Sequence, residues 1–209
     1  MECCRMVLGE VSTNCYLLYD EEERRALIID PAARQDLIME KIRELSLKPL
    51  AVLLTHGHFD HIMAADELKK RYQIPIYAGK GEKEILADST RNYTGTLGKK
   101  PISMVADIWL SDRELLCLGG MNLLVLATPG HTEGSCCYYA PDEQILFSGD
   151  TIFAGNYGRT DLHTGDRDKI AQSIQKLLTE LPETVTILPG HGPETTVAEE
   201  RLENPLSPF

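Results

Sequence analysis

Short apolar runs rich in strand-forming residues recur along the whole chain, and each is bounded by Gly, Pro, Asp or Asn. Runs of this kind are typical of β-strands separated by turns. We therefore predict strands in residues 4–11, 14–20, 25–30, 50–55, 74–79, 115–119, 121–128, 135–141, 144–150 and 184–190.

A spacing of three to four residues between apolar positions marks the segments between these runs. It predicts helices in residues 34–47, 61–72 and 166–181. Thr196 is followed three positions later by Glu199, which is the spacing of a capping box and predicts a short final helix. Because strands and helices interleave, the fold class is α/β. The two halves show a similar order of elements, which indicates two sheets packed face to face with helices outside.

Residues 88–106 are the least regular part of the chain, and we expect an excursion there that brings Asn92 and Tyr93 near the functional site. No linker, low-complexity segment or repeat is visible in the sequence, so we predict a single domain over residues 1–209. No apolar run approaches the roughly 20 residues that span a bilayer. The first ten residues lack the pattern of a signal peptide. We therefore expect a cytoplasmic protein without a membrane partner.

Net charge and cysteine spacing argue against some classes of function. The 21 basic and 32 acidic residues give a formal net charge of −11, which argues against binding to a phosphate backbone. The six cysteines include two adjacent pairs, and neither pair has the C-x-x-C spacing of a zinc or thioredoxin site. We expect free, partly buried thiols. The oligomeric state stays open.

Three histidines and an aspartate are crowded into the stretch LLTHGHFDHI, residues 53–62. In an extended segment, side chains two residues apart point the same way, so His56 and His58 can hold one ion together. Asp60 and His61 follow where the apolar spacing becomes helical, so they face a different point. Packing does not require three imidazoles in six residues, and the cluster predicts ligands for two neighbouring metal ions.

Three more candidate ligands follow predicted strands. His131, Asp150 and His191 each come after an apolar run that ends in a Gly-containing turn, where an α/β scaffold holds ligands on rigid supports. We assign His56, His58 and His131 to one metal ion, and Asp60, His61 and His191 to the other, with Asp150 bridging the two. Nitrogen and oxygen ligands without a thiolate suit a catalytic Zn, Fe or Mn site, and we favour two Zn ions.

Simpler interpretations were weighed at each position. A lone histidine such as His131 or His191 is usually a hydrogen-bonded or surface residue, and only the neighbouring cluster makes it a ligand candidate. For His163 we keep the interpretation of an exposed loop residue. Ser148 lacks the G-x-S-x-G elbow of a nucleophilic serine, and we interpret it as a turn residue.

The motifs THGHFDH (55–61), TPGHTEGS (128–135), SGDTIFAGNYGRTD (148–161) and LPGHGPETT (188–196) together resemble the metallo-β-lactamase fold, and within it the glyoxalase II-like hydrolases. The resemblance runs along almost the entire chain. It implies a four-layer αββα sandwich with a dinuclear site at one edge of the two sheets.

The resemblance also implies a hydroxyacylglutathione-type thioester as the small-molecule substrate. Two divalent ions about 3.5–4 Å apart lower the pKa of a bridging water toward roughly 7, so a metal-bridging hydroxide can attack the thioester carbonyl. Asp60 and Asp150 are then catalytic as well as ligating, because Asp60 orients the hydroxide. Glyoxalase II itself has an additional C-terminal helical domain, whereas only 18 residues follow His191 here.

The sequence indicates substrate-binding residues less clearly than metal ligands. Arg159 can bind a substrate carboxylate through two hydrogen bonds, or it can pair with Asp161 or Asp150, and we favour the structural role. Asn156, Tyr157 and Tyr93 are further candidates for the rim of the substrate site.

Four other functions are compatible with parts of the pattern. A persulfide dioxygenase is the main alternative. The resemblance to these enzymes, which share the fold, implies a mononuclear iron site whose ligands would be His56, His131 and Asp150. A nuclease conflicts with the net charge of −11. A non-catalytic metal-binding module would require a vestigial site, yet all seven positions hold competent ligands. A physiological β-lactamase would need export, for which we find no signal.

Overall fold

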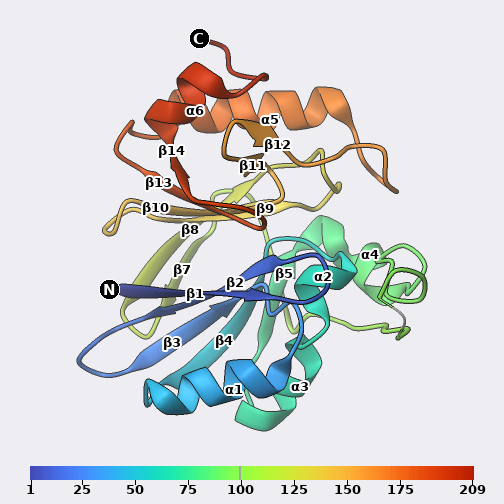
Figure 1. Ribbon diagram of the computed structural model, residues 1–209, viewed down its shortest axis with the longest axis vertical. Helices are drawn as coiled ribbons and strands as arrows, with labels where there is room; N and C mark the ends of the chain where they lie inside the picture. The colour runs from blue at the N-terminus through green and yellow to red at the C-terminus, as the bar shows by residue number, and fades with distance from the viewer. Residues whose placement is uncertain (99) are drawn as a thin grey trace.

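Two six-stranded sheets form the centre of the molecule (Figure 1). The structure is a computed structural model that describes residues 1–98 and 100–209. The first sheet has the order β1-β2-β3-β4-β5-β6. Its strands are β1 (Glu2–Leu8), β2 (Thr13–Tyr19), β3 (Arg25–Ile29), β4 (Lys48–Leu54), β5 (Ile76–Gly79) and β6 (Ile108–Leu110).

The second sheet has the order β14-β13-β10-β9-β8-β7. Its strands are β7 (Leu115–Leu118), β8 (Met121–Ala127), β9 (Cys136–Ala140), β10 (Ile145–Gly149), β13 (Thr186–Pro189) and β14 (Thr195–Thr196). A separate pair of short antiparallel strands, β11 (Ile152–Phe153) and β12 (Asn156–Tyr157), follows β10.

Helices cover the outer faces of both sheets (Figure 1). Below the first sheet lie α1 (Gln35–Glu44) and α3 (Ala65–Tyr72), and above the second lie α5 (Arg167–Glu180) and α6 (Val197–Glu203). Shorter helices complete the chain: α2 (Phe59–Ile62), a 3₁₀ turn at Lys80–Glu82, and α4 (Lys83–Ala87). This is the predicted four-layer αββα sandwich.

The alternation of side chains along the central strands explains the layers. In β2, Leu17 packs toward the helices below, whereas Leu18 faces the second sheet. In β9, Tyr138 faces the first sheet, and Cys137 packs toward the helices above. Because both faces of these strands are buried, they appear in the sequence as continuous apolar runs instead of alternating ones.

The predicted strands are present, with shifted boundaries. The run 4–11 includes a turn, because the strand ends at Leu8 and Gly9 has a φ of 78°. The predicted helix 61–72 is divided into α2 and α3. The capping box at Thr196 and Glu199 is confirmed, since each side chain bonds to the backbone of the other residue. Strand β6 was missed because its three residues carry too short a pattern.

The segment 88–106 holds no helix or strand among its described residues, as predicted; Lys99 lies outside the described residues. Asn92 organises it from inside, because its side chain donates to the carbonyl of Ile102 at 3.0 Å and accepts from the hydroxyl of Thr94 at 2.6 Å. The carbonyl of Asn92 also accepts from the amide of Phe59 at the start of α2. The excursion is therefore anchored beside the HGHFDH segment.

Two further expectations can be checked. All six cysteines are free, and three of them are buried. Within the described ranges, none of the helices combines the length and apolar character that crossing a bilayer requires.

Candidate metal centre

The ends of four strands converge at one edge of the sandwich. The amide of Asn14 on β2 donates to the carbonyl of Gly190 at 2.7 Å, and the amide of Cys136 donates to the carbonyl of Thr55 at 2.9 Å. These hydrogen bonds tie the first sheet to the second. The seven predicted ligands emerge from this edge: His56, His58, Asp60 and His61 after β4, His131 after β8, Asp150 after β10 and His191 after β13.

Three imidazoles form the first group. The Nε2 atom of His131 lies 3.2 Å from Nε2 of His56 and 2.9 Å from Nδ1 of His58. All three side chains are buried, and their nitrogens lie close enough together to hold one ion. Nitrogens bound to one tetrahedral ion at about 2.0–2.1 Å would be separated by roughly 3.3 Å, which is close to the observed spacing.

The other ring nitrogens of this group set its protonation. Nδ1 of His131 donates to the carbonyl of Arg159 at 2.8 Å. Nδ1 of His56 lies 3.1 Å from the hydroxyl of Thr55, whose hydrogen is already donated to Asp30 at 2.6 Å. The neutral imidazoles of His56 and His131 therefore carry their protons on Nδ1, and their Nε2 atoms present lone pairs to each other. Facing lone pairs repel unless a cation lies between them.

A second group joins Asp60, His61 and His191. Nε2 of His191 lies 3.1 Å from Oδ2 of Asp60, and Nε2 of His61 lies 3.5 Å from the same oxygen. Nδ1 of His61 donates to Asp30 at 2.9 Å, which turns Nε2 toward the carboxylates. The hydroxyl of Thr13 donates to Oδ2 of Asp60 at 2.9 Å and fixes that carboxylate.

Asp150 lies between the two groups. Its Oδ2 is 3.6 Å from Nε2 of His131 and 3.5 Å from Nε2 of His191, and its Oδ1 is 3.3 Å from Nε2 of His61. The carboxylate therefore reaches one histidine of the first group and two of the second. Gly190 makes room for it, because a Cβ at that position would lie 2.2 Å from Oδ1 of Asp150.

The two groups differ in their electrostatics. In the first group, burial and the neighbouring histidines lower the pKa of His56 well below its usual value, and burial lowers the pKa of His58 to about 3. In the second group, burial opposes charge on His61 and His191, but the carboxylates of Asp60 and Asp150 outweigh it. The pKa of His61 is raised well above its usual value, and that of His191 to about 9.

Some buried atoms at this centre have no hydrogen-bond partner, and they are of the kind that ligate a metal ion. Among the described residues, the buried side-chain atoms without a hydrogen-bond partner include Nε2 of His61 and Oδ1 of Asp150, which lie 3.3 Å apart. Buried polar atoms are normally paired, so two unpaired ligand atoms at a single centre need an explanation. Imidazole nitrogen and carboxylate oxygen are good ligands for Zn, Fe and Mn, and the residues fit divalent ions.

Asp30 is a residue of this centre that our sequence analysis missed. It is buried and accepts hydrogen bonds from the amide and hydroxyl of Thr55, and from His61. Asp30 therefore orients one histidine of each group, directly for His61 and through Thr55 for His56. It ends the apolar run 25–30, so the strand-end argument that selected Asp150 could have selected it too.

A second missed residue is Glu82, which is fully buried. Its carboxylate accepts from the amide of Gly57 at 2.7 Å and from the hydroxyl of Thr132. Gly57 separates His56 from His58, and Thr132 follows His131. Glu82 thus ties together the two loops that supply the first group. No spacing in the sequence indicated this role.

Of the predicted substrate residues, Arg159 lies at the surface. Its guanidinium makes two hydrogen bonds of 2.7 Å each to the carboxylate of Asp161, and both side chains are largely exposed. This is the pairing that the favoured structural interpretation expects. The contribution of Arg159 to the centre comes through its main chain, which accepts from His131.

The remaining candidates are distributed around the centre. The ring of Tyr93 packs edge-on to His58 with centroids 5.6 Å apart, and its hydroxyl accepts from the amide of His163 at 3.0 Å. Tyr157 packs against the core below α5 and α6, and the side chain of Asn156 accepts from the amide of Tyr157. Tyr93 is therefore the candidate that contacts a ligand side chain. His163 is exposed, as expected.

A family model described as "Metallo-beta-lactamase superfamily" matches residues 8–191. That range contains all seven converging side chains. The chain belongs to the metallo-β-lactamase superfamily. As a member of this superfamily, it is a metal-dependent hydrolase.

Curated relatives in this superfamily extend over nearly the full chain. The Bacillus subtilis (strain 168) protein named "Probable metallo-hydrolase YqgX" is 41% identical over 207 residues, covering 99% of this chain and 97% of its own. The hydroxyacylglutathione hydrolase GloC of Haemophilus influenzae is 35% identical over 195 residues, covering 92% of each chain.

Solved structures show the same fold. BLEG-1, described as a B3 metallo-β-lactamase, superposes with a TM-score of 0.93 at 38% identity over 100% of both chains. TTHA1623 in a di-iron-bound form gives 0.86 at 31% identity, covering 97% of this chain and 98% of its own. ETHE1 from Myxococcus xanthus gives 0.83 at 30% identity, covering 98% and 84%. These members of the superfamily differ in name, and TTHA1623 is described with two iron ions.

Proposed function

We propose that this superfamily member is a dinuclear hydrolase that cleaves thioesters of the hydroxyacylglutathione type to a hydroxy acid and a thiol. One observation carries the dinuclear part of the proposal. Asp150 lies within 3.6 Å of histidines from both groups, so a single carboxylate can contact both ions. In this assignment His56, His58 and His131 hold the first ion, and Asp60, His61 and His191 hold the second.

Two divalent ions bound there would supply a hydroxide at neutral pH and polarise the substrate carbonyl. Side chains and carbonyls around the centre orient the ligands for binding. Asp30 accepts the Nδ1 proton of His61, and the carbonyl of Arg159 accepts that of His131. Thr13 holds Asp60 toward His191. Outer partners of this kind fix the tautomer and orientation of metal ligands.

A thioester suits this centre because a thiolate leaves without protonation by a strong acid. Histidines are the usual source of such an acid near neutral pH. Five of the six histidines belong to the two ligand groups, and the sixth, His163, is exposed. The 35% identity to GloC over nearly the whole chain supports the hydroxyacylglutathione class. We further propose Zn as the metal, a small-molecule substrate without nucleic acid, and action in the cytoplasm.

A persulfide dioxygenase with one iron ion is the second candidate. It is supported by the likeness to ETHE1 at 30% identity, and His56, His131 and Asp150 could provide its two-histidine, one-carboxylate set. This alternative leaves Asp60, His61 and His191 without a role as ligands. The presence of that second group favours the hydrolase.

Purified protein should be assayed with S-D-lactoylglutathione and, in parallel, with glutathione persulfide in an oxygen electrode. The proposal predicts thioester hydrolysis that stops when a chelator removes the metal. Oxygen uptake with persulfide, together with no thioester hydrolysis, would replace the hydrolase by the dioxygenase.

A further inference from the structure

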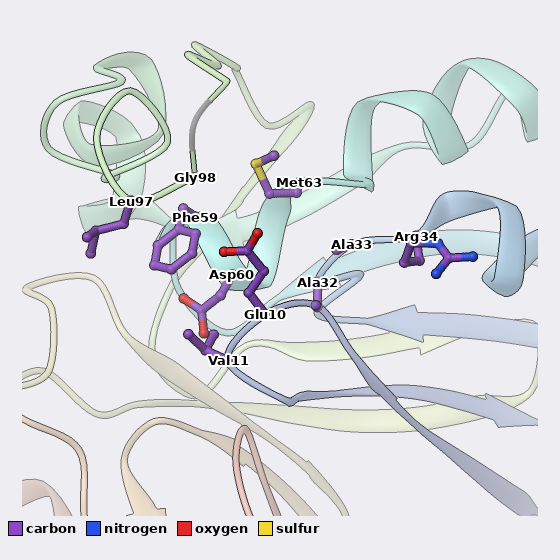
Figure 2. A pocket seen from close by; sticks show the side chains of 11 residues that line it. Glu10, Val11, Ala32, Ala33, Arg34, Phe59, Asp60, Met63, Leu97 and Gly98 are labelled. Atoms are coloured by element: carbon purple, nitrogen blue, oxygen red, sulfur yellow. The ribbon is translucent and has the colours of Figure 1, made fainter.

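A groove of about 410 Å³ opens beside the second ligand group. Asp60 lines it, and the rest of its wall comes from the β1–β2 turn, the loop after β3, helix α2 and the segment around Leu97. Figure 2 shows Val11, Phe59 and Leu97 toward the end nearer Asp60, and Met63 with Ala33 toward the other end. Its volume falls within the range of roughly 300–1,000 Å³ that is common for ligand pockets.

The groove gathers apolar surface that the fold leaves exposed. Val11 is 47% exposed and Leu97 is 54% exposed, although both are large hydrophobic residues. They come from segments more than 80 positions apart in the sequence, yet they line the same cavity. Single exposed hydrophobic residues are ordinary, but apolar side chains that converge on a cavity mark a binding surface.

The charged side chains of the lining do not favour an anionic ligand. Two of them, Glu10 and Asp60, are carboxylates. The basic one, Arg34, makes two hydrogen bonds to Asp36 at 3.0 and 2.8 Å. The described lining thus offers a carboxylate-bearing arm no arginine that is without a carboxylate partner, whereas an apolar arm would be desolvated favourably against Val11, Phe59 and Leu97.

We propose that this groove binds an apolar arm of the substrate, which runs from the reacting carbonyl past Asp60 toward Met63. This inference rests on the proposed thioester hydrolase and adds a substrate class to it: thioesters with an extended apolar substituent. The arm can belong to the acyl group or to the thiol, and the groove recognises the same chemistry in either case.

The test begins with thioesters of glutathione whose acyl group lengthens from acetyl to octanoyl. Each methylene that enters the groove should raise kcat/KM by about fourfold, until the groove is filled. A second series keeps the acetyl group and replaces glutathione by thiols with longer alkyl chains. A rise in kcat/KM with chain length in the first series assigns the groove to the acyl side of the substrate, and a rise in the second series assigns it to the thiol side. Flat profiles in both series overturn the inference.

Two exposed valines of the same hairpin provide a matched pair of variants. Val11 lines the groove, whereas Val7, which is 57% exposed on β1, does not. Val11→Asn should lower kcat/KM about five- to tenfold for the best long-chain substrate and leave the acetyl substrate within about twofold. Val7→Asn should leave both substrates unchanged. Equal effects of the two variants would contradict the proposal.

A binding measurement separates this inference from the proposed function. S-methylglutathione and S-octylglutathione are thioethers, which the protein cannot hydrolyse by attack at a carbonyl. Calorimetry should show tighter binding of the octyl compound, and Ala33→Phe, which fills the groove, should remove that difference. If the octyl and methyl compounds bind alike while S-D-lactoylglutathione is hydrolysed, the groove inference fails and the proposed function stands. If the octyl compound binds tightly but no thioester is hydrolysed, the groove stands and the function fails.

Discussion

The Nε2 atoms of His56 and His131 face each other at 3.2 Å, and in the neutral imidazoles the hydrogen bonds of the two Nδ1 atoms place the proton there and leave both Nε2 atoms unprotonated. Two imidazoles cannot form a hydrogen bond in that state. The fold therefore holds two electron pairs toward one point, at the cost of their repulsion, and a bound cation converts that repulsion into coordination.

Replacing Asp150 by Asn should lower metal content and activity together. The amide keeps the size of the carboxylate but loses its charge and one acceptor oxygen, and Asp150 is the side chain between the two groups. We expect kcat/KM to fall more than about 100-fold, with less than two metal ions per chain in elemental analysis.

Asp142→Asn is a suitable control, because Asp142 lies in the exposed turn between β9 and β10. It makes the same chemical change away from the centre and should keep both metal and activity. Near-normal metal content and turnover in Asp150→Asn would remove the bridging role.

The two metal positions should respond differently to pH. A ligand imidazole must be neutral, and lowered pKa values already keep His56 and His58 neutral at pH 7. His61 and His191 have raised pKa values, about 9 for His191, so they are protonated at pH 7 in the metal-free protein. The second ion must displace those protons, and its affinity should rise steeply as the pH increases toward 9.

Metal titrations of metal-free protein at pH 6.5 and pH 8.5, with a pH indicator to count released protons, would measure this difference. The tighter ion should bind almost equally at both pH values. Affinity for the second ion should rise about tenfold or more per pH unit. The same pH dependence for both ions would contradict the assignment of the two groups.

Glu82 should make stability depend on pH. Burial raises its pKa from 4.5 to about 7, against the hydrogen bonds from Thr132 and Gly57 that lower it. Between about pH 4.5 and pH 7, the carboxyl of Glu82 is therefore protonated in the folded state and ionised in the unfolded state. Stability associated with Glu82 is therefore fully present below about pH 4.5 and is lost as the pH rises through 7, on the order of 3 kcal/mol in all.

Glu82→Gln imitates the protonated carboxyl and should remove this dependence. Chemical denaturation of both proteins should give similar free energies of unfolding at pH 5, and the variant should become the more stable at pH 8. Glu82→Ala, which removes the tie between the loops of Gly57 and Thr132, should weaken binding of the first metal ion at all pH values. A constant difference between wild type and Glu82→Gln from pH 5 to 8 would show that the carboxyl does not titrate there.

Arg159→Ala should have little effect on substrate binding. Its guanidinium pairs with Asp161 at the surface, and an exposed ion pair contributes little to stability because solvent screens it. We expect a small loss of stability, matched by Asp161→Ala, and a KM within about twofold of the wild type. A KM that rises more than tenfold in Arg159→Ala alone would instead make Arg159 a substrate ligand.

Much of the fold was predictable because its strands are buried on both faces. Residues such as Leu17 and Leu18 contribute to different cores, so β2 appears in the sequence as one apolar run. The short strands β6, β11, β12 and β14 could not be predicted, since two or three residues do not establish a pattern. Pairing with a neighbouring strand decides their existence, as when Thr195 of β14 pairs with Ile187 of β13 and Ile108 of β6 pairs with Tyr77 of β5.

The candidate ligands were also accessible from sequence, because His56, His58, Asp60 and His61 are crowded into one segment. The residues that orient these ligands could not be found from the sequence. Asp30 and Glu82 carry no motif, and their roles arise from distances of 2.6–2.9 Å to Thr55, His61 and Gly57 that only the packed fold defines. The groove near Val11 and Leu97 is likewise a product of packing between distant loops.

The most direct test of the account is to follow S-D-lactoylglutathione hydrolysis while metal-free protein is titrated with Zn, with bound metal counted in the same samples. We predict that turnover rises with the metal content and reaches its plateau at two ions per chain. A plateau at one ion, or no hydrolysis with two ions bound, would contradict a dinuclear thioester hydrolase.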